Sequence, residues 1–248
     1  MRQARADSYG CVLLRIAGFR DDFMETKRID RQIHRLAVLL GVLLLVLLVS
    51  ACESTRSSRA SGGFQGVGDF DVVVVDAGHG GHDTGAKAAN GAFEKQLTLD
   101  TARRVARSLR AAGLRVVETR TDDTFIPLDQ RVDRSNNLRN VVFVSVHYNW
   151  AKRAKPSGVE TYYFSPRSAR LAANIQREIA KVSNSPDRGT KQRSLYVLRN
   201  NKRPAVLCEL GFVSNPSENR RLQTADGRQR LAEAVVRGIL AEKSGRNP

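Results

Sequence analysis

Short apolar runs alternate with amphipathic segments along most of the chain. The apolar, β-branched runs predict strands at 71–75, 114–119, 141–146, 158–164 and 204–208. Apolar residues at helical spacing predict helices at 94–112, 128–138, 168–182 and 229–242. Because strands and helices alternate, the pattern predicts an α/β fold: a three-layer sandwich with a mostly parallel central sheet flanked by helices.

The longest apolar run lies near the beginning of the chain. Every residue from Leu36 to Val49 is apolar or glycine, and basic residues at 27, 28, 31 and 35 precede it. A charged segment before a short apolar run indicates an export signal, since a membrane span needs roughly 20 apolar residues. We assign the signal to residues 1–51, with Met24 as an alternative start that gives more usual proportions.

The signal ends in a sequence that resembles the lipobox of bacterial lipoproteins, Leu48 to Cys52. In that motif the cysteine becomes the acylated first residue of the mature protein. The resemblance implies lipidation at Cys52 and an exported protein, lipid-anchored to a membrane that faces the periplasm or cell wall. An uncleaved membrane anchor is the alternative, and it also places the remaining chain outside the cytoplasm.

The composition changes after the signal. Residues 52–69 are rich in Ser, Arg and Gly and too poor in apolar residues to pack, which predicts a flexible tether. A single folded domain is expected over 70–244, followed by a short tail at 245–248. The cysteines form no close pair, so no disulfide framework is expected, and Cys208 is predicted to be a small core residue.

The chain is strongly basic, with a formal net charge of +16. Such a charge favours anionic polymers or anionic lipid headgroups as partners. Nucleic acid is not expected, because the sequence contains no helix-turn-helix, zinc-finger or aromatic RNA-binding motif and carries an export signal.

Metal-binding side chains gather where the predicted strands end. Segments 76–83, 147–149 and 209–215 each follow an apolar strand. In open α/β sheets, functional groups collect at the carboxyl ends of the strands. Three of the four histidines of the chain lie in these segments or their loops, and His34 is the exception. Structural, hydrogen-bonded histidines are the alternative interpretation.

Imidazole and carboxylate groups suit zinc, and a catalytic zinc takes three protein ligands and leaves a fourth position for water. His79 and His147 are the expected nitrogen ligands. The third ligand could be Glu94, at the start of a helix, or His82, in the same loop as His79. The chemistry of the residues leaves both alternatives open.

Several segments resemble, in order and spacing, the motifs of the type-3 N-acetylmuramoyl-L-alanine amidases. They are Val75 to Ala86, Glu94-Lys95, Thr119-Arg120 with Asp122 or Asp123 close behind, Leu128 to Arg131, Val144 to Asn149, Gly158 to Phe164 and Val206 to Asn215. The resemblance covers about Phe70 to Leu240. It implies a zinc-dependent hydrolase that cleaves the amide bond between N-acetylmuramic acid and L-alanine in peptidoglycan.

The resemblance also implies roles for single residues. It implies that His79, Glu94 and His147 bind zinc, and that Glu209 is the catalytic carboxylate. His82 falls at a variable position of the first motif and is expected to be a solvated loop residue.

Further positions of these motifs are expected to have supporting roles. Asp83 and Asn149 are expected to brace the site, and Arg131 to form a structural ion pair. Ser135 and Cys208 stand where the family usually has alanine and an aliphatic residue, and neither touches a proposed ligand. Some members carry a long helical insertion that blocks the zinc until a partner removes it. Between Phe164 and Ser168 only three residues intervene, so no such insertion and no activating partner are expected.

A catalytically silent peptidoglycan-binding lipoprotein of the same fold is the main alternative function. A zinc hydrolase that acts on a different amide has the same ligand set. The presence of every candidate catalytic side chain favours the enzyme.

Overall fold

The computed structural model describes residues 67, 69–88 and 90–245. The predicted signal segment, the lipidation site Cys52 and most of the tether lie outside the described residues. Val67 is described, and its backbone N–H donates to Glu242 at 2.8 Å. No helix among the described residues is long and apolar enough to span a bilayer.

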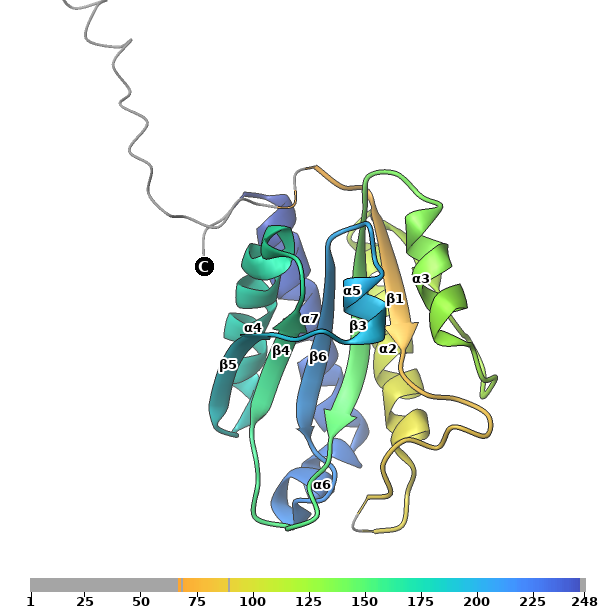
Figure 1. Ribbon diagram of the computed structural model, residues 1–248. Helices are drawn as coiled ribbons and strands as arrows, with labels where there is room; N and C mark the ends of the chain where they lie inside the picture. Colours follow the sequence, from red (N-terminus) through yellow and green to blue (C-terminus); the bar gives the residue numbers. More distant parts are fainter. Residues whose placement is uncertain (1–66, 68, 89, 246–248) are drawn as a thin grey trace, which may run out of the picture. The chain divides into compact units, whose positions relative to one another are not determined.

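In this part of the chain, six strands form one sheet in the order β2-β1-β3-β6-β4-β5 (Figure 1). The strands are β1 (Val72–Ala77), β2 (Arg115–Glu118), β3 (Val141–Asn149), β4 (Val159–Tyr163), β5 (Asp187–Gln192) and β6 (Ala205–Phe212). Neighbouring strands pair in parallel, except that β4 runs antiparallel to β6. The predicted, mostly parallel sheet is confirmed.

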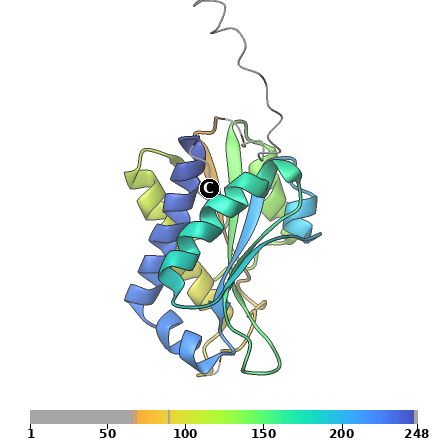
Figure 2. The same ribbon diagram turned by 90° about the vertical axis from the view of Figure 1, so that its left-hand side faces the viewer.

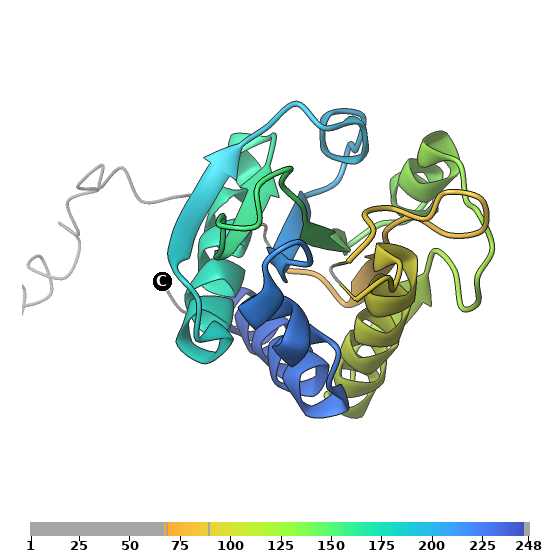
Figure 3. The same cartoon turned by 90° about the horizontal axis from the view of Figure 1, so that it is seen from below.

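Helices cover both faces of the sheet, as predicted. The helical elements are α2 (Glu94–Ala111), α3 (Leu128–Asn136), the 3-10 turn η1 (Pro166–Ser168), α4 (Ala169–Ser183), α5 (Tyr196–Arg199), α6 (Pro216–Leu222) and α7 (Ala225–Lys243). Helices α2, α4 and α7 lie on one face, whereas α3 and α5 lie on the other (Figure 3). Figure 2 shows α4 and α7 side by side, which agrees with their extensive contacts.

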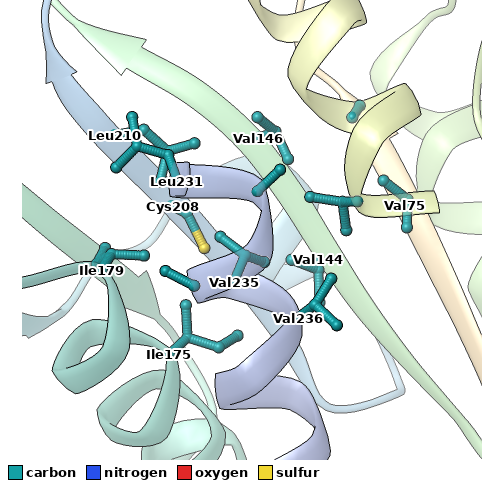
Figure 4. Packing of buried hydrophobic residues seen from close by; sticks show 14 of the residues in the cluster. Val75, Val144, Val146, Ile175, Ile179, Cys208, Leu210, Leu231, Val235 and Val236 are labelled. Carbon is teal, nitrogen blue, oxygen red and sulfur yellow. The ribbon is translucent and has the colours of Figure 1, made fainter. Parts of the chain in front are cut away.

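The larger hydrophobic core lies between the sheet and helices α2, α4 and α7. Strand residues such as Val144 and Leu210 pack there against Ile175 of α4 and Val235 of α7 (Figure 4). Cys208 is fully buried in this core, as predicted, and burial raises the pKa of its thiol to about 12. It therefore behaves as a small apolar side chain.

The structure corrects two expectations about the strands. Segment 187–192, Asp-Arg-Gly-Thr-Lys-Gln, forms β5, although it contains no large apolar residue that predicts a strand. It is an edge strand of the sheet, where polar and charged residues are common because they block pairing with other chains. Strands β3 and β6 also extend beyond the predicted ends, so His147 and Glu209 lie within strands rather than after them.

Candidate active site

His79 lies in the loop that follows β1, and its backbone is held in an unusual conformation. Its φ of 63° is in the left-handed region that residues other than glycine rarely occupy. Both carboxylate oxygens of Asp83 lie 2.9 Å from His79 Nδ1. With Nδ1–H donating to Asp83, Nε2 is the ring nitrogen on the Glu94 side and is the one available to bind a metal ion. Such a histidine–carboxylate pair fixes the ring and its tautomer at metal sites.

Glu94, the first residue of α2, lies between two histidines. Its Oε2 is 3.2 Å from His79 Nε2, and its Oε1 is 3.2 Å from His147 Nδ1. The backbone N–H groups of Ala86 and Tyr148 also donate to this carboxylate, at 3.0 and 2.9 Å. Burial alone would raise the pKa of Glu94, but the hydrogen bonds and charges of the two histidines outweigh it and hold the pKa well below its usual range.

His147 lies near the end of β3, beside an irregularity in the pairing of β3 with β6. Its ring is 4.8 Å from the His79 ring, centroid to centroid, in an edge-on arrangement. Gly78 makes room for it, since a Cβ at that position would lie 2.3 Å from His147 Cε1. A side chain at position 78 would therefore displace the histidine.

His79, Glu94 and His147 fit a zinc ion. One ligand atom from each lies within 4.8 Å of the others, and the two histidine–carboxylate separations are both 3.2 Å. Ligands at zinc distances of 2.0–2.1 Å in tetrahedral geometry are about 3.3 Å apart. Two nitrogens and one oxygen are also a ligand set that catalytic zinc sites use.

His82 is not part of this group. His82 is exposed, and its ring lies tilted against the Phe125 ring with the centroids 4.0 Å apart. Of the two third ligands that the sequence left open, the structure places Glu94 between His79 and His147.

Glu209 lies beside His147 in the sheet. The Cα pairs of the sheet join His147 to Glu209 and Glu209 to Glu160, so the three residues form a row across β3, β6 and β4. Glu209 Oε2 is buried and has no hydrogen-bond partner among the described residues. Burial, followed by the charges of Glu94 and Glu160, raises the pKa of Glu209 well above its ordinary value.

Two buried arginines hold the loop that carries His79. Arg131 donates to Asp76 Oδ1 at 2.8 Å and to the carbonyls of Ala77 and His79 at 2.6 and 2.7 Å. Arg120 donates to the carbonyls of Ala77 and Gly78 at 3.0 and 2.7 Å. The predicted structural ion pair of Arg131 is confirmed, and both guanidinium groups fix the backbone next to His79.

A cavity of about 360 Å³ opens beside the two histidines. His79 and His147 line one part of it, and Phe125, Leu128 and Tyr196 line another. It lies on the face of the sheet that α3 and α5 cover, because its walls come from the segments next to these helices. A substrate bound in this cavity would contact the histidines directly.

The family model described as N-acetylmuramoyl-L-alanine amidase (Amidase_3) matches residues 73–241. The chain belongs to this family. The match includes all four residues of the proposed site, so this amidase carries its candidate zinc ligands and catalytic carboxylate within the family domain.

Two relatives each match about two thirds of this chain. YqiI of Bacillus subtilis (strain 168), an uncharacterized protein, is 39% identical over 172 residues, which are 68% of this chain and 82% of YqiI. The N-acetylmuramoyl-L-alanine amidase LytC of the same strain is 36% identical over 175 residues, 69% of this chain. This match spans only 35% of LytC.

Solved structures show the same fold. The catalytic domain of CwlV, an N-acetylmuramoyl-L-alanine amidase from Bacillus (Paenibacillus) polymyxa var. colistinus, superposes with a TM-score of 0.68 at 37% identity and covers 71% of this chain and 99% of that domain. An N-acetylmuramoyl-L-alanine amidase from Clostridium difficile 630 gives a TM-score of 0.69 at 34% identity, with 72% and 100% coverage.

Sequence reasoning assigned no role to two buried residues of this amidase. Glu160 is 2% exposed, accepts a hydrogen bond from Asn149 Nδ2 at 2.8 Å and contacts Lys191. Asn149 therefore braces Glu160, which agrees with its predicted supporting role. The alternation of side chains along β4 places Glu160 on one face, but only the antiparallel pairing with β6 shows that it neighbours Glu209. Arg120 follows β2 and is buried. Its role was missed because the sequence does not show that this charged side chain is buried.

Proposed function

We propose that this amidase hydrolyses the bond between N-acetylmuramic acid and L-alanine in peptidoglycan, with zinc bound by His79, Glu94 and His147 and with Glu209 as the general base. One observation carries the proposal: two imidazoles and a carboxylate at zinc-ligand separations lie next to a second carboxylate, Glu209, of which one oxygen is buried and has no hydrogen-bond partner among the described residues. The alternative of a silent wall-binding lipoprotein is not favoured, because none of these groups is replaced.

Different residues of the site bind the metal and transfer the proton. A zinc ion at this site would supply Lewis-acid chemistry and activate water near neutral pH. His79 Nε2, His147 Nδ1 and the Glu94 carboxylate would hold the ion, and Asp83 would keep His79 in the required tautomer. The Glu209 carboxylate takes the proton of the attacking water and later delivers it to the departing L-alanine amine.

The surroundings of Glu209 suit this proton transfer. Its Oε2 has no hydrogen-bond partner among the described residues, and the side chain as a whole is partly exposed, so the carboxylate is available to accept a proton. Burial and the nearby carboxylates raise its pKa, which strengthens the carboxylate as a proton acceptor.

Product analysis tests the proposal. The full-length protein, incubated with defined muropeptides, is expected to release the intact glycan and a stem peptide with a free L-alanine amine, identified by mass. A chelator should stop this release, and added zinc should restore it. Cleavage at another bond would reject the substrate assignment, and cleavage that persists in metal-free protein would reject the zinc mechanism.

The third zinc ligand can be tested by metal content. Glu94→Gln replaces the buried carboxylate with a neutral amide of similar size, and we expect the zinc content to fall well below one ion per chain. Elemental analysis of the dialysed protein measures this stoichiometry. His82→Ala is the matched control and should retain its zinc. Loss of zinc from His82→Ala with normal zinc in Glu94→Gln would assign the ligand to His82.

Export and a lipid anchor at Cys52 remain predictions, since the residues concerned lie outside the described part of the chain.

A further inference from the structure

We infer that the cavity beside His79 and His147 is the subsite for the glycan, and that it binds the uncharged sugar on the muramic acid side of the scissile amide. This inference rests on the proposed function and assigns one half of the substrate to a surface. The cavity has a volume of about 360 Å³, which lies within the range of small-molecule sites, ~300–1,000 Å³.

Exposed apolar side chains surround this cavity. Phe125, Leu128 and Tyr196 are 36%, 51% and 41% exposed, and all three line it. Among the described residues, Trp150 is the remaining large hydrophobic side chain with comparable exposure, and it does not line the cavity. Clusters of exposed apolar groups on a soluble domain mark binding surfaces, because exposing them to water is unfavourable.

Two of these side chains are aromatic, and the apolar C–H faces of sugar rings stack on aromatic rings. Phe125 already carries the His82 ring on one side, at a centroid separation of 4.0 Å. Tyr196 is the first residue of α5, so it lines the cavity from a segment far from Phe125 in the chain. A pyranose in the cavity therefore finds an aromatic ring in each of two walls.

The loop segment around Phe125 is held in place before any ligand binds. Gly81 packs against it so closely that a Cβ there would lie 2.9 Å from the Phe125 backbone nitrogen. Asp123 accepts hydrogen bonds from Gly81 N–H at 3.0 Å and from Lys95 Nζ at 2.6 Å. A preorganised surface loses little conformational entropy on binding, which favours affinity.

The charges in the cavity select the sugar rather than the peptide. Its charged lining residues are Asp76, Asp83 and Arg131, besides the two histidines. Arg131 already donates to Asp76 and to three backbone carbonyls, so it has little capacity left for a ligand carboxylate. The stem peptide carries free carboxylates, whereas the lactyl carboxyl of the muramic acid is tied up in the scissile amide. An unpaired carboxylate next to Asp76 and Asp83 would be disfavoured.

Separate binding of an uncharged disaccharide and of the free stem tetrapeptide tests this assignment. The disaccharide of two N-acetylglucosamine units lacks the lactyl carboxylate that hydrolysis leaves on N-acetylmuramic acid, and neither ligand contains the scissile bond. Calorimetric titration of the zinc-loaded full-length protein measures the Kd of each. We expect Phe125→Ala and Tyr196→Ala to weaken disaccharide binding roughly three- to tenfold, and tetrapeptide binding less than about twofold.

Controls separate ring contacts from general damage. Tyr196→Phe keeps the ring and should restore disaccharide binding, whereas Trp150→Ala removes an exposed aromatic side chain outside the cavity and should leave the Kd unchanged. With intact muropeptides, the alanine variants should raise KM with little change in kcat, since the removed contacts act equally on substrate and transition state.

Two results would overturn the assignment: unchanged disaccharide binding in both alanine variants, or a loss of tetrapeptide affinity as large as that of the disaccharide. Failure of the proposed function looks different. Wild-type protein that binds the disaccharide without cleaving muropeptides would reject the amidase activity and leave the sugar subsite standing.

Discussion

Glu209→Gln is expected to lower the rate of muropeptide cleavage roughly 10²- to 10⁴-fold, the usual contribution of a general acid–base group. The amide has nearly the same shape as the carboxylate but cannot take a proton from water. Because Glu209 lies beside the proposed zinc ligands and is not one of them, zinc content should stay at the wild-type value. Steady-state rates and elemental analysis of the same preparation measure both quantities.

Glu233→Gln is the matched control for this change. Glu233 lies on α7 and is exposed, so the same chemical change there should leave rate and zinc content unaltered. Normal cleavage by Glu209→Gln with zinc bound would show that another group acts as the base. A loss of zinc in Glu209→Gln would instead make this carboxylate a ligand.

Asp76→Asn should lower the free energy of unfolding by roughly 3–5 kcal/mol, because it removes one partner of a buried ion pair and leaves the other charge uncompensated. Asp76 and Arg131 are only 1% and 2% exposed. Asp76 also accepts hydrogen bonds from Thr119 and Ser145, both at 2.7 Å. Urea unfolding of the zinc-free proteins measures the difference without a contribution from bound metal.

The exposed pair of Asp226 and Arg230 on α7 supplies the comparison. These side chains are 71% and 58% exposed, so Asp226→Asn should cost less than about 1 kcal/mol. If both variants lost the same free energy of unfolding, burial would not explain the stability that the Asp76–Arg131 pair provides.

The effect of Asp76 should also depend on pH. Burial alone would raise the pKa of Asp76, but Arg131, Ser145 and Thr119 outweigh it and hold the pKa below its ordinary value. A group with a lowered folded-state pKa stabilises the fold above its unfolded-state pKa, about 3.9, and this contribution is lost as the pH falls through the folded-state value. The gap between wild type and Asp76→Asn should therefore narrow below about pH 4.

The sequence predicted the fold wherever a strand is buried on both faces. In β1, Val73 and Val75 pack into one core while Val72 and Val74 pack into the other, so the strand reads as a continuous apolar run. Strand β5 has no such signal, because an edge strand needs neither buried face nor apolar alternation. The reversal of β4 could not be predicted either, since strand direction depends on how the connecting segments pack.

The sequence predicted those site residues whose type and position next to a strand or in a family motif identify them. His79 and His147 stand out as histidines next to strands, and the family resemblance implied Glu94 as the third ligand. The sequence alone could not exclude His82, because its distance from the other ligands depends on the path of the loop. The row formed by His147, Glu209 and Glu160 was also hidden, since it depends on the register of three strands far apart in the chain.

Strand β6 lies in the interior of the sheet, between β3 and β4, and carries Glu209. His79, Glu94 and His147 come from elements that precede β6 in the chain, so only Glu209 depends directly on its insertion. The proposed base therefore reaches its place beside His147 only when β6 has paired with β3.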